Sequence, residues 1–362
     1  MVRNDIMDEG LGAQRVLFLV VMLSVAFARL PFFDNGPDAS PPTQTTCDAF
    51  AAYAGPRIVA VGDVHGDYNA LREVLAAAGL VGDASESCEW TGEDATLIQI
   101  GDVADRGPDV ARANECLRAL QAAAPADGGR VVRLVGNHEL IRAEGSFRDA
   151  HPREAARIAS VRIWRSEVEA GAVQAGFAVG PFLFTHSGFR PSMLRRLQRR
   201  TPDELAAHVN DRLTRALQTC VETAGTASCS FRDDVFSAGP DRGGRGVGGT
   251  FWTDWGVLSS APQVDLPDAM MQIVGHTAAR CSPRSGRCEP IRFRPDLRAA
   301  VVDAGLSRAY GSNRAYLEID KGRVSSRWLR PGSATRRPGW THRNLTDACT
   351  GRGLEGPKFS SR

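Results

Sequence analysis

The chain has 362 residues, of which 43% are hydrophobic, 24% charged and 7% aromatic. This composition can fill one or two hydrophobic cores, and it excludes disordered chains, collagens and polytopic membrane proteins. The 44 basic and 42 acidic residues leave a net charge of +2, which excludes a strong global attraction to nucleic acid. Only Lys321 and Lys358 are lysines, so nearly every basic residue is an arginine. We attribute this skew mainly to background composition, although guanidinium groups also suit anion binding.

Residues 1–28 have the parts of a secretory signal peptide. Arg3 and Arg15 precede the apolar run 16–25, and the small-residue sequence AFA follows it. A bilayer-spanning helix needs about 20 apolar residues, so a cleaved signal is favoured over a retained anchor. We therefore predict export to the periplasm or the exterior, with membrane anchoring through residues 16–30 as the alternative.

The rest of the chain divides into a linker, a folded domain and a tail. Residues 29–55 are polar and contain proline, and residues 331–362 are rich in Arg, Gly and Pro, which predicts a flexible tail. Residues 56–330 alternate apolar runs with helical patterns, which predicts an α/β domain. The predicted strands are 57–61, 96–100, 131–135, 182–185, 272–274 and 299–302. The predicted helices are 68–78, 110–123 and one that begins with the capping box Thr201-Pro202-Asp203-Glu204.

Five of these strands run into a loop that combines glycine with a metal-capable side chain. The loops contain, in chain order, GDVHG, GDVADRG, GNHE, HSG and VGHT. Ligands gather at the carboxyl ends of strands in open α/β sheets, and glycine allows the backbone to approach them closely. We expect the five loops to form one site.

The side chains in these loops form a mixed set of nitrogen and oxygen donors. Such a set suits Mn, Fe or Zn better than Mg or Ca. Four of the seven histidines lie in the loops, whereas His151, His208 and His342 have helix-like or tail positions. A carboxylate such as Asp102 can bridge two ions. The predicted metal ligands are Asp63, His65, Asp102, Asn137, His186 and His276.

Taken in this order, the loop motifs resemble the signature of the PPP-family metallophosphatases, within the calcineurin-like metallophosphoesterase superfamily. The resemblance covers about residues 56–320. The segments GGTFWTDW, VGHT and VDAGLSRAYG look most like the Shewanella-like protein phosphatases, and the DRG sequence distinguishes the chain from ApaH-like diadenosine tetraphosphatases. The resemblance implies a β-sandwich of two mixed sheets flanked by helices, in αββα layers.

The same resemblance implies two divalent or trivalent metal ions that share Asp102. Asp63 and His65 would be the other ligands of the first ion. The other ligands of the second ion would be Asn137, His186 and His276. A hydroxide between the ions would attack phosphorus in line with the leaving group.

The resemblance also assigns residues that bind and protonate the substrate. His138 would protonate the leaving oxygen, Asp105 would hold its ring, and Arg106 would bind phosphoryl oxygens. A second phosphate-binding arginine is expected near residue 245, where we favour Arg245 over Arg242. Tyr310 lies where the family often has a tyrosine near the substrate, and a packed core aromatic is the alternative.

The eight cysteines should form disulfides if the chain is exported. Two pairs are close in sequence, so we predict short-loop disulfides from Cys220 to Cys229 and from Cys281 to Cys288. The remaining four can pair in three ways that the sequence does not rank: Cys47, Cys88, Cys116 and Cys349.

Together these features predict a phosphomonoesterase that acts on phosphoproteins at Ser/Thr or Tyr, with no nucleic-acid partner. Hydrolysis of a small phosphate ester or a dinucleotide polyphosphate is the alternative activity. A metal-bound, non-catalytic binding module is the alternative of another class. The presence of His138, Asp105 and Arg106 argues against that module.

Overall fold

The computed structural model describes residues 40–82, 88–153, 160–198, 201–223, 226–242, 244, 248–279, 289–329 and 340–350. The predicted signal peptide, the anchor alternative at 16–30, Arg245 and the pair Cys281 and Cys288 lie outside these residues. Within the described ranges, no helix has the length and apolar character needed to cross a membrane.

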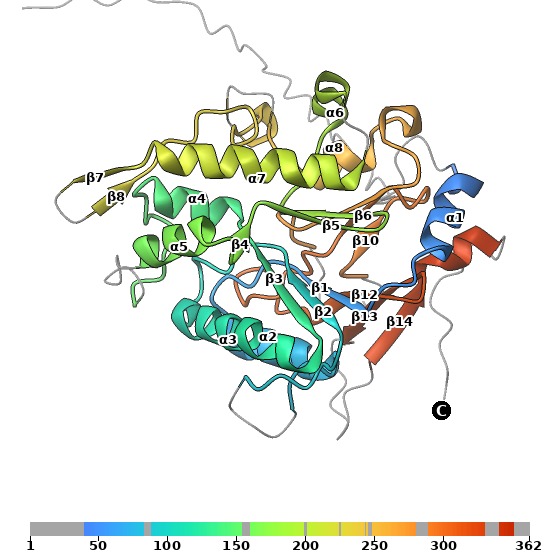
Figure 1. The fold of residues 1–362 in the computed structure, drawn as a ribbon, viewed down its shortest axis with the longest axis horizontal. Coiled ribbons are helices and arrows are strands. Elements are labelled where there is room, and N and C mark those ends of the chain that lie inside the picture. Colours follow the sequence, from blue (N-terminus) through green and yellow to red (C-terminus); the bar gives the residue numbers. More distant parts are fainter. Residues whose placement is uncertain are drawn as a thin grey trace, which may run out of the picture. The chain divides into compact units, whose positions relative to one another are not determined.

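Two mixed β-sheets pack against each other and are flanked by helices (Figure 1), as the family resemblance implies. In the larger sheet, parallel strands occupy one half and antiparallel strands the other. Its order is β14 (Trp340–Asn344), β13 (Arg323–Leu329), β12 (Ala315–Asp320), β1 (Ile58–Val61), β2 (Thr96–Gln99), β3 (Arg130–Leu134) and β4 (Val173–Gln174). The smaller sheet has the order β10 (Arg292–Phe293), β11 (Ala299–Val301), β9 (Met271–Val274), β6 (Phe182–Thr185) and β5 (Gly176–Val179).

The apolar runs of the central strands are buried on both faces. In β1, Ile58 and Ala60 belong to the core between the sheets, whereas Val59 and Val61 belong to the core under the helices. Successive side chains of a strand point to opposite faces, so a strand covered on both sides needs a continuous apolar run. This explains why the predicted strands agree with the observed ones to within about one residue.

Helices cover the outer face of each sheet (Figure 1). Helices α2 (Tyr68–Ala77) and α3 (Val110–Ala123) share a core with β1 and β2, and α7 (Pro202–Gln218) shares one with β6. The capping box predicted at the start of α7 is present, because Thr201 Oγ1 accepts the Glu204 N–H. The other elements are α1 (Gln44–Ala51), α4 (Asn137–Ala143), α5 (Ser160–Glu169), α6 (Pro191–Leu197), α8 (Trp255–Ser259), β7 (Val221–Thr223) and β8 (Thr226–Ser228).

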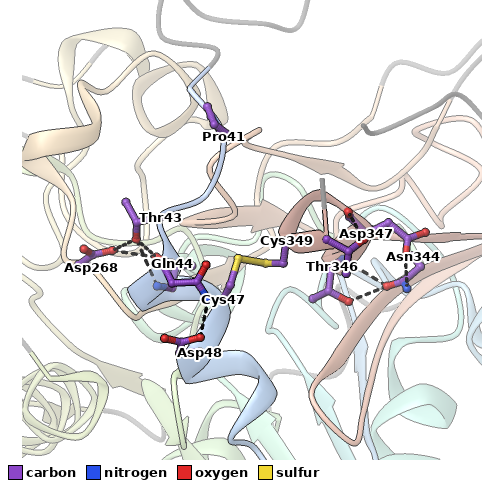
Figure 2. Close-up of a disulfide and its surroundings, with 12 residues drawn as sticks. Pro41, Thr43, Gln44, Cys47, Asp48, Asp268, Asn344, Thr346, Asp347 and Cys349 are labelled. Atoms are coloured by element: carbon purple, nitrogen blue, oxygen red, sulfur yellow. Dashed lines mark hydrogen bonds between the residues drawn. A yellow bond between two sulfur atoms is a disulfide. The ribbon is translucent and has the colours of Figure 1, made fainter. Parts of the chain in front are cut away.

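Parts of the predicted linker and tail belong to the fold. Helix α1 lies within 29–55, and β14 and the 3-10 helix Leu345–Thr350 lie within 331–362. Phe50 of α1 stacks on Phe182, with 5.3 Å between ring centroids. A disulfide joins Cys47 to Cys349 (Figure 2). Composition alone did not reveal these elements, because their stabilising contacts come from distant parts of the chain.

Two further disulfides occur in the described residues. The predicted bond between Cys220 and Cys229 is present, beside the β7–β8 hairpin. Cys88 pairs with Cys116, which, together with the Cys47–Cys349 bond, selects one of the three open pairings. Disulfides persist in oxidising compartments, so this pattern is compatible with an extracellular or secreted protein.

Candidate active site

The five glycine-containing loops meet where the parallel strands end. Strands β1, β2 and β3 are parallel neighbours, and so are β6 and β9 in the second sheet. The His65 N–H donates to the Asp102 carbonyl oxygen over 2.9 Å, which joins the first two loops. Across the sandwich, His186 Nδ1 lies 2.9 Å from the Ile100 carbonyl oxygen. The loops therefore form one site, as expected from their positions in the sequence.

Asp102 lies at the centre of the predicted metal ligands. Its Oδ2 atom is 3.7 Å from His65 Nε2 and 3.4 Å from His186 Nε2. Two buried groups of ligand atoms share Asp102, one with His65 and His138 and the other with His186 and His276. The side chain of Asp102 is thus placed to serve two ions.

Asn137 and Asp63 complete the cluster. Asn137 Oδ1 lies 2.8 Å from both His186 Nε2 and His276 Nδ1. The Asp63 carboxylate accepts the His276 N–H, with both oxygens at 3.1 Å, and its Oδ2 is 3.9 Å from His65 Nε2. All six predicted ligands are buried.

Strained and tightly packed backbone holds these residues. His65, Asp102 and His276 have φ values of 45°, 52° and 70°, in the left-handed region that non-glycine residues rarely adopt. A Cβ atom at Gly136 would overlap Asp102, so the GNHE loop requires glycine there. Strain of this kind costs about 1–3 kcal/mol for each residue and is concentrated at functional sites.

The chemistry of the donor atoms fits metal ions. Nδ1 of His65 lies 2.9 Å from the Ala104 carbonyl oxygen, and Nδ1 of His186 has the equivalent contact with Ile100. A hydrogen bond to a carbonyl places the proton on Nδ1, which leaves the Nε2 lone pair of each ring facing Asp102. In addition, His276 Nε2 is buried without a hydrogen-bond partner in the described part of the chain.

The electrostatics of the cluster also favour a bound cation. Burial, together with the charges of Asp303 and Asp102, raises the pKa of Asp63. Burial lowers the pKa of His65 to about 4, which keeps its ring neutral. At His186, burial is outweighed by the Asp102 carboxylate, which raises the pKa of the ring. Buried carboxylates are costly unless a positive charge compensates them.

The predicted proton donor lies beside the cluster. His138 Nδ1 is 2.6 Å from Asp105 Oδ2, and the His138 N–H donates to Asp102 Oδ1 over 2.9 Å. Burial would lower the pKa of His138, but the carboxylates of Asp102 and Asp105 raise it overall. Because an imidazolium can donate a proton from Nε2, this arrangement suits a general acid.

A cavity of about 920 Å³ opens over the cluster. Arg106 and Arg242 line it, and each is held by a carboxylate. Arg106 Nη1 lies 3.0 Å from Asp149 Oδ1. Both oxygens of Asp254 accept from Arg242, the Nε contact being 2.8 Å.

Aromatic side chains also line this cavity. The Tyr310 ring lies 5.1 Å from the His65 ring, and Trp252 packs edge-on against His276. Tyr310 is therefore placed at the cavity, where the sequence predicted it, rather than in a core remote from the site.

Comparison with known proteins identifies the domain. Residues 56–235 match the family model described as calcineurin-like phosphoesterase. The chain carries a calcineurin-like metallophosphoesterase domain. A domain of this family implies divalent metal ions, in agreement with the His and Asp groups around Asp102.

Relatives of this metallophosphoesterase domain include named phosphatases. An uncharacterized protein of Schizosaccharomyces pombe is 47% identical over 95 residues, or 26% of this chain and 28% of that protein. The Shewanella-like protein phosphatase 2 of Arabidopsis thaliana is 41% identical over 92 residues, or 25% of this chain and 23% of that protein. The chain thus spans about a quarter of the length of these curated relatives.

A solved structure supports the fold of the metallophosphoesterase domain. A cold-active protein tyrosine phosphatase superposes with a TM-score of 0.53 over 75% of this chain and 76% of its own. The sequence identity is 19%, so this likeness supports the fold alone.

The metallophosphoesterase site contains residues that our sequence analysis missed. Asp303 is buried beside Asp63, and burial raises its pKa to about 6. It directly follows the predicted strand 299–302, so the strand-end pattern that identified the other loops could have found it. Arg142 and Asp149 contact predicted site residues, but no motif or strand end marks them in the sequence.

Proposed function

We propose that this domain hydrolyses phosphomonoesters and that its substrates are phosphorylated proteins. The observation that carries the proposal is the hydrogen-bonded pair of His138 and Asp105, which adjoins the buried cluster of ligand atoms around Asp102. A proton donor next to a site for two cations suits cleavage of a phosphate ester. A binding module would have no use for this proton donor.

The metal ligands we propose are those predicted from the sequence. Asp63, His65 and Asp102 would hold one ion, and Asp102 would share the second with three others: Asn137, His186 and His276. When bound, Mn, Fe or Zn ions would supply a nucleophile at neutral pH and neutralise charge on the phosphoryl group.

The side chains of this chain perform the remaining tasks. His138 donates its Nε2 proton to the leaving oxygen as the bond between phosphorus and that oxygen breaks. Asp105 accepts the Nδ1–H of the same ring, which fixes the ring and directs Nε2 toward the cavity. Arg106 binds the phosphoryl oxygens, because its planar guanidinium offers two parallel donors.

We assign the second phosphate-binding arginine to Arg242 in place of Arg245. Arg242 lines the cavity, and the two-point contact with Asp254 fixes the plane of its guanidinium. Tyr310 lies on another side of the same cavity and would contact the substrate there.

The names of similar proteins favour a phosphoprotein substrate. The Arabidopsis thaliana relative and a relative from Plasmodium berghei are both named Shewanella-like protein phosphatases. Small phosphate esters and dinucleotide polyphosphates could be cleaved by the same site and are the alternative. The disulfides support a location in the periplasm or outside the cell.

The full-length protein loaded with Mn²⁺ is expected to hydrolyse p-nitrophenyl phosphate, and a chelator should stop the reaction until Mn²⁺ is restored. Phosphotyrosine, phosphoserine and phosphothreonine peptides should be cleaved faster than diadenosine tetraphosphate at equal concentration. Binding of Mn²⁺ without turnover of any of these compounds would instead identify a binding module.

Replacing Arg242 with alanine should lower kcat/KM for p-nitrophenyl phosphate by about 10- to 100-fold, the value of one hydrogen bond to a charged group. Arg195→Ala is the matched control, because Arg195 pairs with Asp265 at the surface and does not line the cavity. Equal kinetics in the two variants would overturn the assignment of Arg242.

A further inference from the structure

A buried arginine lies behind the His138–Asp105 pair. Arg142 Nε donates to Asp105 Oδ1 over 2.6 Å, and the other oxygen of the same carboxylate is 2.6 Å from His138 Nδ1. The two oxygens of Asp105 are therefore divided between one arginine and one histidine. Arg142 is only 6% exposed, so solvent does not weaken its contact.

The helix geometry explains this shared contact. His138 and Arg142 both belong to α4 and are four residues apart, so their side chains lie on the same face of the helix. Asp105 comes from the loop after β2 and meets that face. One short helix thus supplies both groups that hold the carboxylate.

The other carboxylates near Arg142 already accept hydrogen bonds from other groups. Glu139 accepts three backbone N–H groups, from Asp102, Ala104 and Gly136. Glu167 is shared by Arg118 and Arg133. Asp105 is therefore the carboxylate that pairs with the Arg142 guanidinium.

One terminal nitrogen of Arg142 argues against a purely stabilising role. Its Nη2 atom is buried and has no hydrogen-bond partner among the described residues. A cavity of about 50 Å³ adjoins Arg142 and Trp164, and Trp164 Nε1 likewise lacks a partner in this part of the chain. A buried charge with an unpaired N–H is a poor stabilising device, because its desolvation is not fully compensated.

We propose that Arg142 is a positioning residue for proton transfer to the leaving oxygen. It acts through Asp105, whose carboxylate plane it fixes so that Oδ2 holds the Nδ1–H of His138 and Nε2 faces the cavity. During the reaction His138 gives its Nε2 proton to the leaving oxygen, and Arg142 and Asp105 keep their charges. The proposal rests on the proposed function, because it takes His138 as the acid.

Leaving-group dependence distinguishes positioning from a structural role. p-Nitrophenolate leaves readily without a proton, whereas phenolate requires one. Arg142→Gln is expected to lower kcat for phenyl phosphate at least 10-fold more than for p-nitrophenyl phosphate, with KM and metal content unchanged. Arg142→Lys keeps the charge and should recover part of the loss. Equal losses on the two substrates would overturn the proposal.

A double-mutant cycle tests whether Arg142 acts through Asp105. The combined variant with Asp105→Asn and Arg142→Gln should lose no more activity on phenyl phosphate than Asp105→Asn alone. Losses that multiply would show that Arg142 acts independently of Asp105. Arg133→Gln is the matched control, because Arg133 is equally buried but pairs with Glu167, and it should leave the leaving-group dependence unchanged.

An NMR measurement on the metal-free, full-length protein provides a readout that needs no turnover. The short hydrogen bond to Asp105 should give the His138 Nδ1 proton a downfield resonance in the wild type. Arg142→Gln should shift or broaden this resonance, whereas Arg133→Gln and Arg142→Lys should retain it. An unchanged resonance in Arg142→Gln would refute the positioning role. Absence of hydrolysis by the wild type would instead refute the proposed function.

Discussion

Replacing Asp102 with asparagine is expected to abolish metal binding and turnover together. Oδ2 of Asp102 approaches the Nε2 atoms of both His65 and His186, so both predicted ion sites depend on this one carboxylate. Asparagine has nearly the same shape but carries no charge. Without that charge, the buried histidines lose the anion that draws a cation into the site.

Metal content per chain and kcat for p-nitrophenyl phosphate measure this effect. Asp109→Asn is the control, because Asp109 is the N-cap of α3, where asparagine is equally favourable, and it does not line the cavity. The control should keep both metal ions and full activity. An Asp102→Asn protein with two bound ions and wild-type turnover would contradict the proposed mechanism.

Replacing His138 with alanine should lower kcat for phenyl phosphate by about 100-fold or more, the usual contribution of a positioned general acid. We expect metal content to stay constant, because His138 is bound by Asp105 and its Nε2 lies 4.0 Å from Asp102 Oδ2. The loss should be smaller for p-nitrophenyl phosphate, whose leaving group needs little protonation.

The same variant distinguishes an acid from a ligand. His138 also lies within reach of the ligand atoms of His65 and Asp102. If His138 were a ligand, His138→Ala would lose an ion along with its activity. His208→Ala, which alters a histidine of α7 outside the cavity lining, is the control and should change neither quantity.

Much of the fold could be predicted because the central strands are buried on both faces. Their apolar or β-branched runs, such as the continuous apolar run 58–61, identify them, and each carboxyl end identifies a site loop. The pair of His138 and Asp105 could be predicted from the order of these loops together with the family resemblance.

Other features depend on contacts that a local pattern does not contain. Helix α1 and strand β14 lie in segments whose composition is typical of a linker and a tail. Our proposal of Arg242 rests on its contact with Asp254, which the sequence alone does not reveal. In the sequence, Arg142 resembles an ordinary exposed arginine of a helix. Only the structure shows that the loop after β2 places Asp105 against it.

The Cys47–Cys349 bond has a consequence for the integrity of the protein. Because 302 positions separate these cysteines, the bond closes nearly the whole catalytic domain into a covalent ring. A single cut in any surface loop between them opens the ring but leaves one connected molecule. The loops that carry Asp63 and His276 therefore remain covalently joined after a proteolytic nick.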